Sequence, residues 1–240
     1  GLTWTEASLP SVPDGHGLGA FTPAALNASG KIWVFYAANG VGIFYFTSTD
    51  NGASWTGPTA VPNVSGFKVW NHMDAIKAND GSIWVFYWGD PGNAIYARKY
   101  DGVNWSGPIL VGNPLSYTGT PRALQEADNT FRVVYIAGDP LGIYLATSVD
   151  GGITWGSSLI INTAYDDYDP VLVKDGSTWR LFFAPYIPAD DHQWLMTAYS
   201  TDLASWSSPL MVTVGACGAN KWWDFYPEAV IASSELVLFY

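Results

Sequence analysis

Cysteine is almost absent from this chain of 240 residues, and basic residues are few. Cys217 is the single cysteine, which excludes an internal disulfide and a metal cage built from thiolates. Four arginines and six lysines stand against 21 acidic residues, so the formal net charge is -11. Such a chain repels a polyanion, and we exclude nucleic acid as a partner. No apolar run approaches the length of a membrane span.

What the chain has in quantity is aromatic residues, glycine and proline. Aromatic residues make up 16% of the sequence, with 13 tryptophans among them, and charged residues only 13%. This composition is typical of many short strands joined by tight turns. An acidic chain rich in tryptophan and poor in lysine also favours an extracellular protein, secreted or held at the cell surface. We expect the sequence to be a mature or trimmed chain.

One turn sequence recurs four times at regular spacing. STDNGASW at 48–55 returns as SVDGGITW at 148–155, with shorter copies in YDGVNW at 100–105 and STDLASW at 200–206. The tryptophans that close these turns, together with Trp4, are 51, 50, 50 and 51 residues apart. A period near 50 residues with strand-type content predicts a β-propeller.

Two strand-like segments precede each turn. The second is an apolar run such as KIWVFY at 31–36, and the first is a shorter segment such as DPVLV at 169–173. We therefore predict an all-β propeller of five blades, each a four-stranded antiparallel sheet, in a single domain spanning 1–240. The N-terminal strand would complete the last blade and close the ring. A longer native chain with another number of blades stays open. The predicted units are about 11–61, 62–111, 112–161, 162–212, and 213–240 with 1–10.

The repeated turn has a defined chemistry. An aspartate side chain can accept hydrogen bonds from backbone N–H groups of its own turn, and glycine supplies a positive φ. The tryptophan is expected to pack its ring between neighbouring units. The stretch resembles the Asp-box of sialidases and other sugar-processing propellers. The Asp-box is a structural motif, so the resemblance favours the fold and not a catalytic role.

The first strands of the five units predict a common site at one mouth of the channel. Strand side chains alternate, so the residues before and after the proline position of each strand point the same way. Charged groups that converge in this manner need solvent or a ligand to offset them. Aromatic residues on the same face offer flat platforms for a ligand. The polar candidates are His72, Asp74, Arg122, Asp169 and Glu228, with Tyr226; the aromatic ones are Trp70, Trp88, Trp222, Trp223, Tyr165, Tyr168 and Tyr186.

This set of groups is suited to glycoside hydrolysis. One carboxylic acid protonates the leaving oxygen, and one carboxylate acts as base or nucleophile. Proximity of like charges raises the pKa of one member, as an acid working near neutral pH requires. The alternative stays open that these aspartates cap turns and that Arg122 forms a structural ion pair.

Two segments sharpen the interpretation. YDPVLVKDGSTWRLFF at 168–183 and FYPEAVIASSELVLFY at 225–240 resemble the Asp-Pro and Glu strands of five-bladed arabinanases and β-xylosidases. In that superfamily a base Asp, an Asp that tunes the acid, and the acid Glu lie on blades n, n+2 and n+3. The resemblance implies that Asp74 is the base, Asp169 the pKa modulator and Glu228 the acid. Unlike that family, the chain carries its candidate base on the second unit.

Other site chemistries receive less support. A sialidase needs three arginines around a carboxylate, and Arg122 alone is well placed. His72 has no metal-ligand spacing around it, so we expect no transition metal and no cofactor. An oxygen-ligated structural Ca²⁺ stays open at the enlarged loop 188–194, where Asp190, Asp191 and His192 line the expected rim, or in the channel.

We therefore favour a glycoside hydrolase that acts on an oligo- or polysaccharide. The alternative is a non-catalytic propeller that binds carbohydrate or serves as a surface or assembly module. The mouth residues differ from unit to unit, as a single asymmetric site requires, whereas a lectin would repeat the same side chains. The sugar, the linkage, the stereochemistry, the oligomeric state and the native length stay open.

Overall fold

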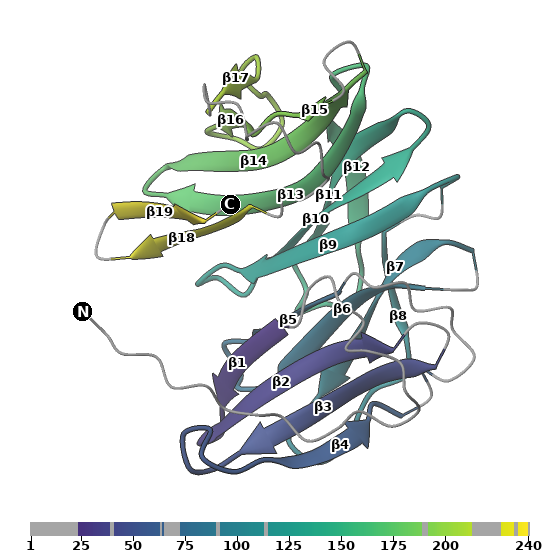
Figure 1. The fold of residues 1–240 in the computed structure, drawn as a ribbon, viewed down its shortest axis with the longest axis vertical. Coiled ribbons are helices and arrows are strands. Elements are labelled where there is room, and N and C mark those ends of the chain that lie inside the picture. The colour runs from purple at the N-terminus through teal and green to yellow at the C-terminus, as the bar shows by residue number, and fades with distance from the viewer. Residues whose placement is uncertain are drawn as a thin grey trace. The chain divides into compact units, whose positions relative to one another are not determined.

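The structure is a computed structural model that describes residues 24–38, 41–62, 64, 73–89, 92–112, 115–188, 192–212, 227–232 and 235–239. These residues form strands and turns in five antiparallel sheets, with no helix among them (Figure 1). The chain divides into two compact units. Unit 1 comprises Gly1–Pro91 and Tyr96–Ile109, and unit 2 comprises Gly92–Ile95 and Leu110–Tyr240. The prediction of a single domain stays a prediction.

Unit 1 contains the sheet β1–β4 and most of the sheet β5–β8, and the first strands of these two sheets, β1 and β5, pack against each other. Its core is aromatic and aliphatic, with Trp33, Phe35, Val85 and Tyr87 buried in one cluster. The strands follow chain order in both sheets: β1 (Ala24–Ala28), β2 (Lys31–Ala38), β3 (Gly42–Ser48) and β4 (Thr56–Ala60); then β5 (Met73–Lys77), β6 (Ile83–Gly89), β7 (Ala94–Tyr100) and β8 (Ile109–Gly112).

Unit 2 contains three sheets, and its inner strands lie side by side, with β13 in contact with both β9 and β18 (Figure 1). A core cluster that includes Val134, Ile143, Leu181 and Phe183 joins the first two sheets. The sheets are β9 (Thr118–Gln125), β10 (Phe131–Gly138), β11 (Leu141–Ser148) and β12 (Gly156–Ile161); β13 (Asp166–Asp175), β14 (Thr178–Ile187), β16 (Met196–Ser200) and β17 (Leu210–Met211), with β15 (His192–Gln193) paired to β14; and β18 (Glu228–Ala232) with β19 (Glu235–Phe239).

The strand pattern read from the sequence is present in all five repeats. Each predicted pair of strands before a turn forms an antiparallel pair, from β1 with β2 to β18 with β19. The second strand of each pair is a short apolar run, and β6 is buried on both faces, as such a run indicates. Four sheets reach four strands in a row, and the fifth has two in the described residues. Closure of the ring falls on residues 1–10 and 213–226, which lie outside the described residues.

The repeated turns make the hydrogen bonds predicted from their sequence. In the first turn, Asp50 accepts bonds from the backbone N–H of Ser54 at 2.8 Å and from the hydroxyl of Ser48 at 2.7 Å. Gly52 has a φ of 89°, in the region that favours glycine, and its N–H donates to Ser48 Oγ at 2.8 Å. Hydrogen bonds from Ser54 and Ser48 lower the pKa of Asp50 to about 2.

The second full copy repeats this arrangement. Asp150 accepts bonds from Thr154 N–H at 2.9 Å and from Ser148 Oγ at 2.7 Å, and the pKa of Asp150 is lowered to about 2 by the same kinds of bond. The shortened copies keep part of it, because Asp101 accepts from the N–H groups of Val103 and Asn104. These aspartates are therefore saturated with local donors and hold their turns together.

The tryptophans that close the turns do not all pack alike. Trp105 lies between β7 and β8 of the second sheet and packs against Phe35 and Tyr45 of the first sheet, as predicted. In unit 2, Trp206 packs on the cluster that joins the first two sheets. By contrast, Trp55 packs on a cluster formed by its own sheet.

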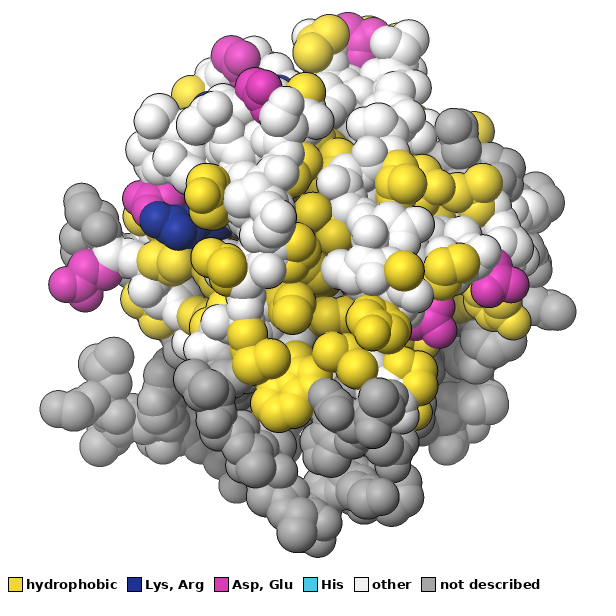
Figure 2. Space-filling model, turned by 90° about the horizontal axis from the view of Figure 1, so that it is seen from above, with side chains coloured by type: hydrophobic (Ala, Val, Ile, Leu, Met, Phe, Trp, Pro, Cys, Tyr) yellow, Lys and Arg dark blue, Asp and Glu magenta, His cyan; other side chains and the backbone are white. Residues whose placement is uncertain are grey.

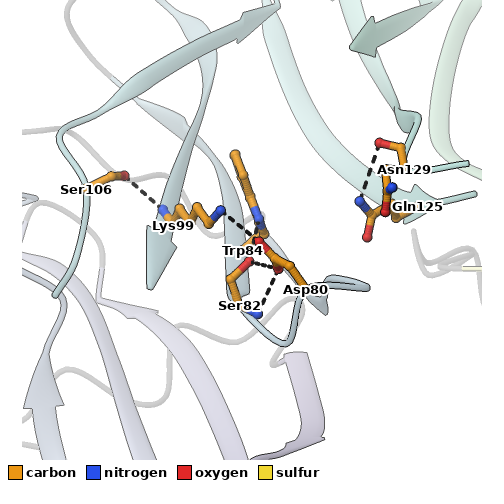
Figure 3. Close-up of polar contacts among 7 residues, drawn as sticks. All are labelled: Asp80, Ser82, Trp84, Lys99, Ser106, Gln125 and Asn129. Atoms are coloured by element: carbon orange, nitrogen blue, oxygen red, sulfur yellow. Dashed lines mark hydrogen bonds and ion pairs between the residues drawn. The ribbon is translucent and has the colours of Figure 1, made fainter. Parts of the chain in front are cut away.

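A second kind of turn in unit 1 is stabilised by an ion pair (Figure 3). Asp80 accepts bonds from the N–H and the hydroxyl of Ser82, and Lys99 Nζ lies 2.9 Å from Asp80 Oδ2. Ser82 Oγ in turn accepts from the indole of Trp84. Burial alone would raise the pKa of Asp80, but these bonds and the charge of Lys99 outweigh burial and lower the pKa to about 2.

Candidate functional site

The inner strands of unit 2 bring together three of the charged residues predicted from sequence. Arg122 lies on β9, Asp169 on β13 and Glu228 at the start of β18. Arg122 Nη2 lies 2.6 Å from Glu228 Oε1, and the charge of Arg122 acts on Asp169 as well. The Arg122 side chain is 15% exposed and that of Glu228 is 54% exposed. The guanidinium of Arg122 thus acts on both carboxyl groups. Solvent reaches this site on the side of Glu228, which is the more exposed residue.

Bulges set the direction of these side chains. In β9, Thr120 and Pro121 lie opposite one residue of β10, because Gly119 pairs with Ile136 and Arg122 with Val134. In β13, Asp169 and Pro170 likewise lie between the pairs Tyr168–Ala184 and Val171–Phe182. A bulge re-aims the side chains beside it, and bulges occur often next to active sites.

Both bulges hold a non-glycine residue in left-handed backbone. Thr120 has a φ of 45° and Asp169 a φ of 50°. For a β-branched residue such as threonine this conformation is an outlier, and it costs about 1–3 kcal/mol. The same strained conformation occurs at the same step of two adjacent inner strands. We therefore interpret it as a sign of function rather than as a result of packing.

Asp169 carries the most perturbed carboxyl of the site. Burial raises the pKa of Asp169 to about 7, and the nearby charge of Arg122 offsets only part of this effect. Next to it, burial raises the pKa of Tyr168 to about 12, with the carboxylates of Asp166 and Asp169 adding to the shift. Asp169 is therefore able to hold a proton at neutral pH, whereas the Tyr168 phenol stays protonated.

Two buried hydroxyls at the same strand start were not counted among the candidates. Thr118 is 3% exposed and Thr120 8% exposed, and neither Oγ1 has a hydrogen-bond partner within the described part of the chain. Buried hydroxyls are usually hydrogen-bonded, so both threonines are added to the candidates for contact with a ligand. The position of Thr120, one residue before Pro121 as Asp169 is before Pro170, was the signal available in the sequence.

Two of the predicted site residues, Asp74 and Trp88, lie in unit 1. Asp74 is on β5, partly buried, and its Oδ1 accepts the backbone N–H of Ala75 at 2.8 Å. Trp88 is partly buried near the end of β6. Their placement relative to Asp169 and Glu228 stays a prediction, and so do the roles assigned to all four residues.

Most of the remaining candidates lie outside the described residues. Tyr165 lines a pocket between β12 and β14 whose walls do not include Arg122, Asp169 or Glu228. Only the backbone of His192 is described, as part of β15, which extends the enlarged loop as a short hairpin with β14. Outside the described residues are Trp70, His72, Asp190, Asp191, Trp222, Trp223 and Tyr226.

The described residues contain no group of three or more side chains placed to hold a metal ion. The same residues contain no helix with the length and hydropathy of a membrane span. What unit 2 does contain is a shared cation, one carboxyl that holds a proton near neutral pH, and a second carboxylate. Such a set can deliver a proton to an oxygen and stabilise the charge that develops there.

Comparison with solved structures identifies the fold as a propeller. A protein of unknown function from Dyadobacter fermentans matches with a TM-score of 0.66 and 15% identity, covering 90% of this chain and 73% of that one. An α-L-arabinanase from Penicillium chrysogenum, solved with arabinobiose, matches with a TM-score of 0.64 and 14% identity, covering 80% and 66%. A polysaccharide lyase acting on ulvan matches with a TM-score of 0.58 and 15% identity, covering 80% and 55%.

At such identities these matches show the fold alone. No protein-family model matches the chain, and neither does the sequence of any curated protein. The expected resemblance to arabinanase-type propellers is confirmed at the level of the fold.

Proposed function

We propose that this protein is a glycoside hydrolase of the propeller type, acting on an oligo- or polysaccharide outside the cell or at its surface. The observation that carries the proposal is the cluster on the inner strands of unit 2. There Arg122 pairs with Glu228 at 2.6 Å and also offsets the charge of Asp169, whose pKa is raised to about 7. The neighbours that act on arabinan and ulvan support a carbohydrate ligand.

In the proposed mechanism, one proton moves between the carboxyl groups of Asp169 and Glu228. In the free protein Arg122 pairs with Glu228, and the proton resides on Asp169. When Arg122 turns to Asp169, the proton is available to Glu228, which then acts as the general acid toward the leaving oxygen. Asp169 thus tunes the acid, and Asp74 of unit 1 is the proposed base that activates water. The reaction requires no cofactor, and a Ca²⁺ at loop 188–194 is proposed only as a structural alternative.

The proposal also concerns the architecture. The repeated Ser-x-Asp turns support an Asp-box propeller, with five blades and a ring closed by residues 1–10. The strained steps at Thr120 and Asp169 support a ligand at the start of the inner strands. The Thr120 hydroxyl, which has no partner among the described residues, would bind a sugar hydroxyl there.

The test is release of reducing sugar from linear arabinan, β-1,3-galactan, xylan and ulvan. The wild type, Glu228→Gln and Glu235→Gln are compared, because Glu235 is an exposed carboxylate on the partner strand β19 and serves as the matched control. We expect release from at least one glycan by the wild type and the control, and loss of that release in Glu228→Gln. Equal release by Glu228→Gln would refute the assignment. Products with an unsaturated sugar would indicate a lyase instead.

A second candidate function is a non-catalytic propeller that binds carbohydrate or serves in assembly. The Arg122–Glu228 ion pair favours it, since a paired carboxylate is already stabilised in its charged form and is a poor proton donor. Under this alternative, binding to a glycan occurs without release of reducing sugar, and Arg122→Ala weakens that binding.

A further inference from the structure

Unit 2 contains a pocket that shares no residue with the carboxylate cluster. It has a volume of about 520 Å³ and opens between the outer strand β12 of one sheet and the strands β14 and β16 of the next. Its walls include Ile160, Asn162, Tyr165, Ile187, Met196 and Trp206. The volume and the mixture of aromatic, aliphatic and few polar walls match those of small-molecule sites.

The chemistry of the walls restricts the ligand. No charged side chain is among the described residues that line the pocket, so an ionic ligand would find no partner. The Trp206 indole already donates to Leu203 O, and Ser207 Oγ already bonds with Tyr199 N and Ser208 O. A ligand must therefore offer a largely apolar surface, with a small number of polar groups at its edge.

The rim of the pocket is held in place by a buried carboxylate. Asp167 is fully buried and accepts bonds from Thr163 N–H at 3.1 Å and Thr163 Oγ1 at 2.6 Å. Asn162 Oδ1 accepts from Ala164 N–H at 2.9 Å, which directs the Asn162 amide group and leaves its nitrogen as a donor. The rim that carries Tyr165 is thus ordered before any ligand binds, which lowers the entropic cost of binding.

Exposed aromatic and aliphatic residues lie on or next to the segments that line the pocket. Tyr165 is 41% exposed, and Leu159 of β12 and Leu210 and Met211 of β17 are also exposed. Figure 2 shows hydrophobic side chains gathered in a band on one face of the protein, with charged ones at its edges.

We propose that this pocket is a second carbohydrate site, which binds one or two neutral sugar rings of a glycan through their C–H faces. The electron-rich faces of Tyr165 and Trp206 would contact the sugar ring, and the Asn162 amide would donate to a ring hydroxyl. The inference rests on the proposed carbohydrate ligand but not on hydrolysis. Such a site would hold a long chain on the protein while the carboxylate cluster acts elsewhere on it.

Affinity electrophoresis tests the proposal. Protein carrying Glu228→Gln, which prevents degradation of the gel, is run through linear arabinan, β-1,3-galactan or xylan. We expect at least one glycan to retard it, and Tyr165→Ala to weaken the apparent affinity about tenfold. Ala204→Phe, which fills the pocket from an exposed wall position, is expected to do the same. Tyr199→Ala removes an exposed tyrosine of the same sheet outside the pocket and is the matched control.

The possible results separate this proposal from that of hydrolysis. Retardation that is unchanged by Tyr165→Ala and Ala204→Phe overturns the pocket, as does an absence of retardation by every glycan. Retardation that depends on Tyr165 in a protein without hydrolytic activity supports the pocket and refutes the hydrolase.

Discussion

Aspartates occur in two very different settings in this chain. In the repeated turns, Asp50 and Asp150 are exposed, accept several local hydrogen bonds and have a pKa lowered to about 2. On the inner strand of unit 2, Asp169 lies in strained backbone, is partly buried beside a shared arginine and has a pKa raised to about 7. The same side chain is thus a structural acceptor in one place and a holder of protons in the other. Solvent and local donors, not residue type, make the difference.

The largest effect is expected on catalysis. Glu228→Gln and Asp169→Asn should each lower the rate on a polysaccharide by about 100- to 10,000-fold, because each removes a group that controls proton transfer. On an aryl glycoside with an activated leaving group, which needs no acid, both variants should recover much of the lost rate, because Asp169 acts through the acid Glu228. Steady-state kinetics on the two substrates provides the measurement. If only Asp169→Asn recovered its rate on the aryl glycoside, Asp169 would be the general acid and Glu228 the residue that tunes it.

A turn aspartate should give the opposite result in the same assay. Asp150→Ala should leave the rate per folded molecule unchanged, since Asp150 bonds only within its own turn in the described contacts. A rate lowered as far as in Asp169→Asn would show that the two settings do not differ in function.

Stability should respond to Asp169 with a clear dependence on pH. The pKa of Asp169 is raised in the folded state, so its contribution to stability is full below the unfolded value near 4 and is lost as pH rises through about 7. Asp169→Asn has no charge to bury and should be more stable than the wild type by about 1–2 kcal/mol at pH 8, with the difference vanishing near pH 4. Urea unfolding at both pH values tests this. A destabilised Asp169→Asn at pH 8 would mean that Arg122 outweighs burial.

The smallest effect on stability is expected at the turns, where the dependence of stability on pH has the opposite sign. The pKa of Asp150 is lowered in the folded state, so its contribution to stability is present above about 4 and is lost as pH falls toward 2. Asp150→Ala should lower Tm by a few degrees at pH 7, and Asp101→Ala, in a shortened turn with fewer bonds, by less. Thermal unfolding at pH 7 and pH 3 measures both. A Tm that is lowered equally at the two pH values would exclude the proposed role of the charge.

The fold could be read from the sequence because its signals are local. The apolar runs of β2, β6 and β10 and the Ser-x-Asp turns recur with a fixed period. Each of these features is specified by residues within a single sequence repeat. Arg122, Asp169 and Glu228 were found by aligning the proline positions of the inner strands. The bulges at Thr120 and Asp169 could not be predicted, because a residue before proline is expected in extended backbone, and only packing between strands holds it at a positive φ.

The pocket could not be predicted from the sequence, for a related reason. Its walls come from β12, from the loop that follows it, and from the start and end of strands in the next sheet, so no single repeat carries its pattern. The buried contact of Asp167 with Thr163, which orders the rim, depends in the same way on how two sheets meet within unit 2.

The central claim is that the inner strands of unit 2 hold one proton between two carboxylates around Arg122. A carboxyl-carbon NMR titration of the intact protein, with assignments from Asp169→Asn and Glu228→Gln, measures this directly. The account predicts that the Asp169 signal titrates near pH 7 and that the Glu228 signal responds in the same step, because both share Arg122. An Asp169 signal that titrates near pH 4, with no coupled response at Glu228, would contradict it.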